Sequence, residues 1–393
     1  MRPELLAPAG DLEKARIACL YGADSVYLGG NRLSLRARAA KLDLSGIRET
    51  ALVAHGYKKK LFVTVNAVPH AEDLAGLDDY LVALDKANVD AIICSDAYVM
   101  ERAKALTNLK IHISTQLSVA NSRLVEHYLN QGASRIVLAR ELSLSEIALI
   151  RNKTKAELEV FIHGGMCVSY SGRCTLANAM SRRDANRGGC AHNCRWTYDL
   201  YKDGRLLADD FAFAAKDLGA IGQIPELIAL GVDAFKIEGR MKSLHYIASV
   251  VKTYRMLIDD VFDKTTKPRE YYQELLAKAE NRPLGPGSLL GPAGLESQLY
   301  QDEPQTASQD FIGVVRGYDQ QHQELLVEQR NHFRPGELIE VLRPRKETLR
   351  FIVGAIRSES GAILDAARHP QENLRIPLGI PLEPYDLLRR VSS

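Results

Sequence analysis

The feature that most constrains the fold is a pattern repeated through the first two thirds of the chain. A short β-branched, apolar run ends in small or polar residues, and an amphipathic stretch follows it. We count eight such runs, at residues 4–10, 25–30, 61–67, 91–96, 110–116, 135–141, 158–165 and 234–240. Eight alternating units predict a parallel (β/α)8 barrel of the TIM type. A doubly wound open sheet is the alternative, but no Gly-x-Gly-x-x-Gly motif follows an early strand.

The chain has 393 residues, which fits one large domain and a small one. Residues 1–280 are predicted to form the barrel, and the Gly- and Pro-rich stretch 281–307 a linker. Short strands over 308–393 predict a small β-barrel domain. The seventh unit is abnormal, because roughly 70 residues separate Gly165 from Ala234. We therefore expect an insertion after the seventh strand, at the end of the barrel where active sites are built.

Charge and hydropathy restrict the location and the partners of the chain. The formal net charge is +2, so any nucleic-acid binding must come from a local patch. The first residues lack the apolar run of a signal peptide, and no uncharged stretch is long enough to span a membrane. These observations predict a cytoplasmic protein that does not contact a membrane.

Four of the six cysteines lie within 28 positions of the insertion, inside the segment 161–198. A reducing cytosol argues against disulfides and favours metal binding or catalysis. Four thiolates can close a zinc site or hold a [4Fe–4S] cluster. The tight Cys-x2-Cys knuckles typical of structural zinc are missing, so the spacing favours iron–sulfur, while zinc and unligated redox thiols stay open. The cysteines are Cys167, Cys174, Cys190 and Cys194.

Polar residues follow several predicted strands, where barrel enzymes carry their catalytic groups. The candidates for catalysis are Asn66, Gln116, His163, Glu238 and Arg240. Any one of them can also be polar only because the chain leaves the core there, and Glu238 and Arg240 can pair with each other. His163 lies four residues before Cys167 and suits an acid/base, a hydrogen-bond donor to a ligand, or a satisfied buried histidine.

The cysteine segment is also rich in arginine and carries the single tryptophan. Positive charge can balance a thiolate-ligated cluster or meet phosphates, and aromatic rings beside arginines can stack on RNA bases. The alternative is that these side chains cap loop carbonyls and pack the insertion. The candidates for RNA binding are Arg173, Arg182, Arg183, Arg187, Arg195 and Trp196.

Two quoted stretches carry a resemblance to a known family. EVFIHGGMCVSYSGRC (159–174) and RDANRGGCAHNCRWTY (183–198) resemble the signature of the peptidase U32 family. Residues 5–30 resemble its N-terminal strand-helix-strand, and residues 213–243 its last βα unit. Within the family, the spacing of the four cysteines and the appended β-domain are most similar to the tRNA hydroxylation protein P branch.

The resemblance implies an iron–sulfur-dependent, oxygen-independent hydroxylase that forms 5-hydroxyuridine at the wobble position of tRNA. It implies that Cys167, Cys174, Cys190 and Cys194 bind a [4Fe–4S] cluster and that prephenate is the co-substrate. It also implies tRNA as a partner, a paralogous U32 chain as a second one, and an RNA contact by the C-terminal domain. Sister branches hydroxylate 23S rRNA cytidine or ubiquinone precursors, which are alternative substrates.

Two other classes of function stay open. A peptidase could use Cys167 or Cys174 as nucleophile and His163 as base, although no Gly-x-Ser-x-Gly elbow or His-Glu-x-x-His helix is present. A nucleophilic thiol needs no three companions, and a cluster ligand is not free to attack. The third class is a non-catalytic RNA-binding protein that uses the cluster structurally.

Overall fold

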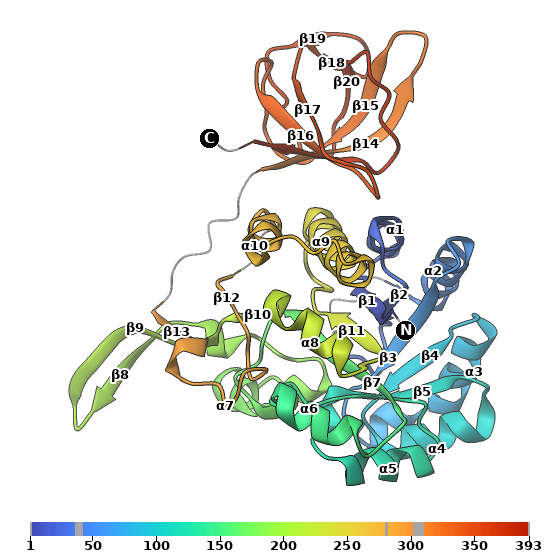
Figure 1. Cartoon of the computed structure of the whole chain (residues 1–393), viewed down its shortest axis with the longest axis vertical. Helices are drawn as coiled ribbons and strands as arrows, with labels where there is room; N and C mark the ends of the chain where they lie inside the picture. The colour runs from blue at the N-terminus through green and yellow to red at the C-terminus, as the bar shows by residue number, and fades with distance from the viewer. Residues whose placement is uncertain (1, 36–41, 280–281, 302–309, 392–393) are drawn as a thin grey trace. The chain divides into compact units, whose positions relative to one another are not determined.

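The computed structural model describes residues 2–35, 42–279, 282–301 and 310–391. The chain divides into two compact units, Met1–Pro304 and Gln305–Ser393. Figure 1 shows the first unit as a ring of strands covered by helices and the second as an all-β unit. Among the described residues, no helix has both the length and the apolar character needed to cross a membrane.

The first unit is a closed barrel of eight parallel strands. The strands follow one another in sequence order around the ring, and β11 pairs with both β1 and β7, which closes it. All eight predicted strands are therefore confirmed, and so is the barrel. The strands are β1 (Glu4–Pro8), β2 (Ser25–Gly29), β3 (Lys60–Val65), β4 (Ala91–Cys94), β5 (Lys110–Ile113), β6 (Arg135–Val137), β7 (Glu157–Gly164) and β11 (Ala234–Ile237).

Helices cover the outside of the barrel, and most begin at a polar residue that follows a strand. Asp11, Asp96 and Ser243, for example, each accept a hydrogen bond from the backbone N–H three residues later, which satisfies a helix end. The helices are α1 (Leu12–Tyr21), α2 (Leu44–Gly56), α3 (Leu77–Lys86), α4 (Ala97–Leu106), α5 (Ser122–Asn130), α6 (Leu144–Arg151), α8 (Ile224–Ala229), α9 (Leu244–Asp263) and α10 (Arg269–Ala277).

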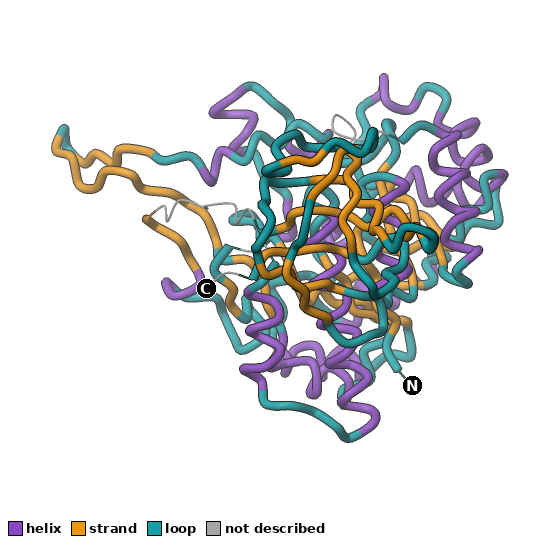
Figure 2. Tube along the Cα trace, turned by 90° about the horizontal axis from the view of Figure 1, so that it is seen from above, coloured by secondary structure: helices purple, strands orange, loops and turns teal. Residues whose placement is uncertain are grey.

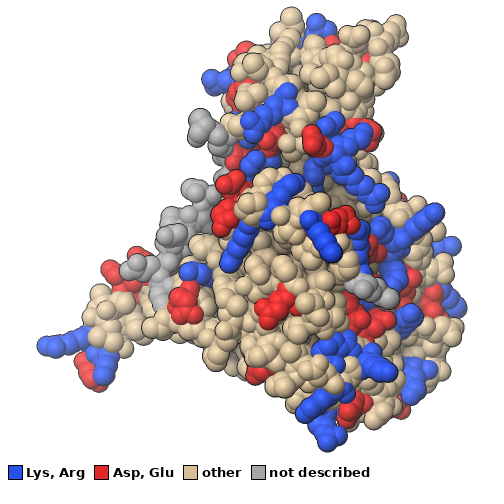
Figure 3. All heavy atoms as spheres, viewed as in Figure 1, with Lys and Arg blue, Asp and Glu red and all other residues tan. Residues whose placement is uncertain are grey.

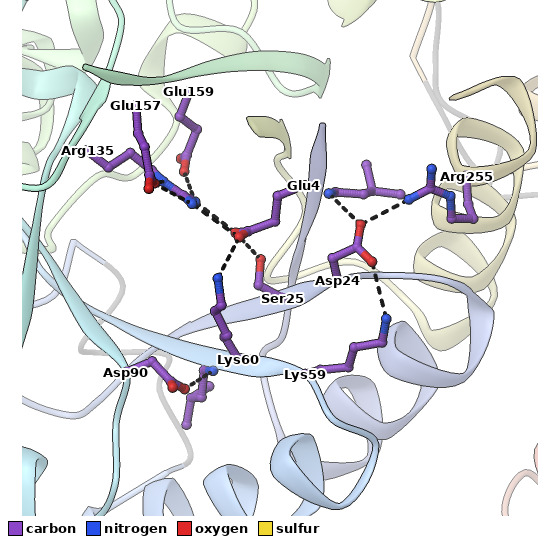
Figure 4. A network of polar contacts seen from close by, with 12 residues as sticks. Glu4, Asp24, Ser25, Lys59, Lys60, Asp90, Arg135, Glu157, Glu159 and Arg255 are labelled. Carbon is purple, nitrogen blue, oxygen red and sulfur yellow. Dashed lines mark hydrogen bonds and ion pairs between the residues drawn. The ribbon is translucent and has the colours of Figure 1, made fainter. Parts of the chain in front are cut away.

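Charged residues fill the N-terminal end of the barrel, below the apolar side chains. Arg135 lies 2.8 Å from Glu4, 3.0 Å from Glu157 and 3.3 Å from Glu159. Figure 4 shows these side chains pointing toward one another from β1, β6 and β7. Burial alone would raise the pKa of Glu4, but the hydrogen bond and charge of Arg135 outweigh it and lower this pKa to about 2. The network holds the strands together at the end opposite the insertion.

The insertion after β7 carries short helices and then a long hairpin. Its helical turns are η4 (Tyr170–Gly172), α7 (Leu176–Ser181), η5 (Ala185–Arg187) and η6 (Asn193–Arg195). The hairpin of β8 (Tyr198–Lys202) and β9 (Arg205–Ala215) projects from the barrel in Figures 1 and 2. Figure 3 shows basic and acidic side chains together at its tip. The short β10 (Asp217–Gly219) then returns to pair antiparallel with β7.

The structure differs from the predicted linker 281–307. Two short strands in it pair with the insertion: β12 (Leu284–Gly285) with β10, and β13 (Gln298–Gln301) with β9. Arg282 also forms an ion pair with the buried Asp217. The described part, 282–301, thus belongs to the barrel unit, because its backbone groups complete sheets there. The other residues of the predicted linker, 281 and 302–307, lie outside the described residues.

The second unit is an eight-stranded antiparallel sheet curled into a half-barrel, in the order β17-β16-β21-β14-β15-β20-β18-β19. Its core includes Ile312, Val327, Phe333 and Leu388. The strands are β14 (Phe311–Asp319), β15 (Glu324–Gln329), β16 (Leu338–Leu342), β17 (Leu349–Ile352), β18 (Ile356–Ser358), β19 (Ile363–Leu364), β20 (Asn373–Pro377) and β21 (Leu387–Arg390).

Candidate active site

A cavity of about 190 Å³ lies between the C-terminal ends of the barrel strands and the cysteine segment. Its wall combines strand-end side chains with residues 165–195 of the insertion. The structure thus brings most of the predicted catalytic and cluster-binding residues to one place. Those that line the cavity are Asn66, Gln116, Cys167, Cys174, Cys190, Cys194, Glu238 and Arg240.

Uncharged polar groups at the ends of β3 and β5 form one part of the wall. The amide nitrogen of Asn66 donates to the side-chain oxygen of Gln116 over 2.7 Å. The Ser114 hydroxyl donates to the same oxygen over 3.2 Å. Gln116 follows β5 in the turn η3 (Thr115–Leu117), which Ser114 caps. The amides are therefore held in place by neighbours that are themselves buried.

A carboxylate and a phenol come together at the ends of β11 and β2. The Tyr27 hydroxyl lies 2.8 Å from Glu238 Oε2 and 3.0 Å from the carbonyl oxygen of Ile237. Burial, and then the negative charge of Glu238, raise the pKa of Tyr27 well above its usual value. Tyr27 is thus a neutral hydrogen-bond donor that orients the Glu238 carboxylate. Glu238 is the carboxylate in the cavity wall best placed to accept a proton.

Arg240 is held by two hydroxyl groups. Its guanidinium donates to Thr64 Oγ1 over 2.9 Å and to Ser34 Oγ over 3.1 Å. A Cβ at Gly29 would collide with both this guanidinium and the Ser34 hydroxyl, so a glycine is required where Arg240 passes β2. Arg240 is buried and lines the cavity, which makes it a fixed positive charge in the wall.

Two further charged residues, Lys236 and Arg140, also line the cavity. Lys236, in the middle of β11, places its amine 2.8 Å from Glu159 and 4.6 Å from the Tyr27 ring centroid. Burial lowers the pKa of Lys236, and the charge of Glu159 opposes this shift. Arg140 stacks over Phe161 at 4.5 Å. The available signal for Lys236 was a lysine inside an otherwise apolar strand.

His163 does not contribute to the cavity wall as the structure describes it. It is buried, with Nδ1 3.3 Å from the Tyr254 hydroxyl and its ring 5.8 Å from that of Tyr246, both on α9. A bulge explains this direction, since Ile162 is an extra residue between the Phe161 and His163 pairings with β11. One extra residue reverses the faces of the strand, so His163 points outward.

The four thiols of the cysteine segment all border the cavity and are partly exposed. Burial, with smaller contributions from the other three cysteines, raises the pKa of Cys194, and Arg195 opposes this shift. The backbone N–H of Leu176 lies 3.3 Å from the sulfur of Cys174. No three His, Cys, Asp or Glu side chains of the described ranges are grouped closely enough to chelate one metal ion.

All four thiols border the same cavity, and four thiolates can hold a [4Fe–4S] cluster or a zinc ion. A second observation agrees with this. Asn193, next to Cys194, is buried, and its side-chain nitrogen has no hydrogen-bond partner in the described structure. A buried donor without a partner is unfavourable, whereas cluster sulfurs accept such hydrogen bonds.

The arginines of the segment divide into groups. Arg187 forms 2.8 Å ion pairs with Glu72 and Asp73 of η2 (Ala71–Leu74), so it fastens the insertion to the barrel. Arg195 lines the cavity. The remaining candidates for RNA binding lie on the surface, where their role stays a prediction: Arg173, Arg182, Arg183 and Trp196.

Comparison with known proteins places this geometry in context. Residues 10–299 match the model of the family described as "Peptidase family U32", and residues 307–389 match its C-terminal domain. The "tRNA hydroxylation protein P1" of Bacillus subtilis is 41% identical over 99% of this chain and 95% of its own length. The Escherichia coli "23S rRNA 5-hydroxycytidine C2501 synthase" is 37% identical over 67% of this chain and 40% of its length. A Porphyromonas gingivalis protein named "Collagenase" is 33% identical over 73% of each chain.

Proposed function

The chain belongs to the peptidase U32 family, and we propose that it is an RNA hydroxylase that forms 5-hydroxyuridine at the wobble position of tRNA. The observation that carries this proposal is the convergence of four thiols and the strand-end polar groups on one cavity at the mouth of the barrel. Relatives named for hydroxylation of tRNA and of rRNA support the reaction class. Relatives named for tRNA hydroxylation that match nearly the full chain support tRNA as the substrate.

We propose that Cys167, Cys174, Cys190 and Cys194 hold a [4Fe–4S] cluster, toward which the Asn193 amide donates. Such a cluster supplies one-electron transfer next to the cavity. The chain's own residues bind and orient the substrate. Glu238, held by Tyr27, accepts a proton at its carboxylate, and Arg240 attracts negative charge.

Hydroxylation replaces a C–H bond of the base by C–OH, which adds one oxygen atom and removes two electrons. A co-substrate must therefore supply oxygen and accept electrons, and we propose prephenate, without molecular oxygen. Arg140, Arg195 and Arg240 give the cavity wall positive charge that suits a carboxylic acid. The arginines and Trp196 on the surface of the cysteine segment are proposed to contact tRNA.

The decisive experiment is mass spectrometry of nucleosides in total tRNA from the source organism, with and without this gene. We expect 5-hydroxyuridine and its derivatives to disappear on deletion and to return when the gene is supplied on a plasmid. Unchanged levels in the deletion strain would contradict the proposed function. In that strain, hydroxycytidine in rRNA and ubiquinone levels test the sister reactions.

Complementation with cysteine variants tests the role of the thiols. Alanine at any one of the four segment cysteines is expected to remove both the brown colour of the purified protein and 5-hydroxyuridine from tRNA. Cys19→Ala is the matched control, because Cys19 is buried in α1 and lies outside the cavity. Full tRNA hydroxylation by an iron-free variant would exclude a catalytic cluster, and protein cleavage that survives iron removal would favour a peptidase.

A further inference from the structure

We propose that Gln116 selects the base, by presenting a fixed N–H donor to a carbonyl oxygen of the pyrimidine ring. The acceptor is the C4 oxygen of uracil, so the residue discriminates uridine from cytidine. This inference rests on the proposed function, because it names the group that recognises the base in the same cavity.

The orientation of Gln116 follows from a chain of hydrogen bonds that begins at the backbone. The Leu35 N–H can only donate, and it lies 3.4 Å from Asn66 Oδ1. The other end of the Asn66 amide is therefore the nitrogen, which donates to Gln116 Oε1 over 2.7 Å. Ser114 donates to the same oxygen. A backbone group thus fixes the direction of two side-chain amides in series.

The Gln116 side-chain nitrogen takes no part in this series of hydrogen bonds. It is buried and has no hydrogen-bond partner within the described residues, and Gln116 lines the cavity with only 3% of its surface exposed. An unsatisfied buried donor is unfavourable, so a ligand acceptor at this position would satisfy it. Asn66 and Ser114, which bind the oxygen at the other end of this amide, are uncharged. A neutral carbonyl oxygen is sufficient to accept a hydrogen bond from the Gln116 nitrogen.

Uracil and cytosine differ in the group attached to C4 of the ring. Uracil has a C4 oxygen that accepts a hydrogen bond, whereas cytosine has an amino group that donates. A fixed donor therefore pairs with uracil and opposes cytosine, and sites built around such a group reject the mismatched partner strongly.

Two substitutions should reverse the polarity by independent routes. Asn66→Asp keeps an oxygen for the Leu35 N–H and puts a second oxygen toward Gln116. The Gln116 amide then turns its nitrogen to that oxygen and its own oxygen to the cavity. Gln116→Glu places acceptor oxygens in the cavity directly. Gln223→Glu is the matched control, since Gln223 is a buried amide outside the cavity.

The experiment measures binding of the full-length protein, purified without oxygen, to two synthetic tRNA anticodon stem-loops. The stem-loops differ only in having uridine or cytidine at the wobble position. We expect the wild type and Gln223→Glu to bind the uridine form about tenfold more tightly. Asn66→Asp and Gln116→Glu are expected to bring this ratio below one. The ratio of the two affinities is the readout, because added negative charge weakens the binding of both RNAs equally.

Equal affinity of the wild type for the two stem-loops, or no binding of either, would overturn the inference. A cavity that binds only a carboxylic acid would give either of these results. A uridine preference that both variants retain would also overturn the inference. The deletion experiment separates the two failures. If tRNA hydroxylation depends on the gene but the binding ratio does not respond to Asn66 and Gln116, the proposed function stands and only the assignment of Gln116 is wrong.

Discussion

Arg135 is the central cation of the ion-pair network at the N-terminal end of the barrel. Its side chain is 5% exposed and faces Glu4, Glu157 and Glu159. Arg135→Met would leave Glu4 with Lys60 and the buried Glu159 with Lys236 as their remaining cations. Breaking such buried ion pairs typically costs up to about 3–5 kcal/mol of unfolding free energy. Urea unfolding followed by the fluorescence of Trp196, the single tryptophan, measures this loss.

A surface arginine provides the control for this substitution. Arg123 is 90% exposed and pairs with Glu126 on the same helix. Arg123→Met should change the unfolding free energy by about 0–1 kcal/mol, because water screens exposed pairs. Equal effects of the two substitutions would show that the Arg135 network contributes no more than a surface ion pair.

Single residues also show where sequence reasoning succeeds and fails. Asn66, Gln116, Glu238 and Arg240 could be selected because strand ends in a barrel converge on one face. Lys236 was not selected, because it lies inside a strand and not at its end, and a lysine in an otherwise apolar strand was the one signal for it. The direction of His163 depends on a bulge between β7 and β11, which is a property of the pairing of two distant segments.

At the scale of elements, the candidate active site depends on the cysteine segment keeping a fixed conformation. Arg187 fastens it to η2 through Glu72 and Asp73. Arg187→Ala should therefore raise amide hydrogen exchange over about residues 184–190 several-fold, while exchange in the barrel strands stays unchanged. Mass spectrometry of the exchanged protein measures this.

Arg182 supplies the comparison, because it is an exposed residue of the same segment. Arg182→Ala should leave the exchange pattern as in the wild type. If Arg187→Ala also leaves it unchanged, the order of the segment comes from its other contacts, such as the hydrogen bonds between Asn186 and Cys174.

Long, strongly patterned elements were predictable, and short ones were not. The runs predicted at 158–165 and 234–240, for example, correspond to β7 and β11. The strand β12 has two residues, too few to produce a periodic pattern, and it occurs in a stretch rich in Gly and Pro. Its pairing with β10 makes a predicted linker part of the barrel unit.

At the scale of the whole molecule, the two units carry buried carboxyl groups with opposite pKa shifts. In the barrel unit, Arg135 lowers the pKa of Glu4 to about 2 against the effect of burial. In the C-terminal unit, burial raises the pKa of Asp386 to about 6, although the Glu383 N–H donates to it. The two units should therefore respond differently to acid.

The direction for each unit follows from linkage. The pKa of Glu4 is lower folded than unfolded, so its contribution is present above about pH 4.5 and is lost as pH falls toward 2. The pKa of Asp386 is higher folded than unfolded. Its contribution is complete below the unfolded value of about 3.9 and is lost as pH rises through about 6. Each shift corresponds to up to roughly 3 kcal/mol.

Calorimetry at pH 7, 5.5, 4.5 and 3 tests both contributions through matched variants. Between pH 7 and 4.5, the C-terminal unit of the wild type should gain stability relative to Asp386→Asn, because the variant has no carboxyl group to protonate. Below pH 4.5, the barrel unit of the wild type should lose stability relative to a Glu4→Gln variant. If the stability of a variant changed with pH in the same way as that of the wild type does over the pH range given for it, the carboxyl group concerned would not link folding to protonation. Other groups would then set the acid response of that unit.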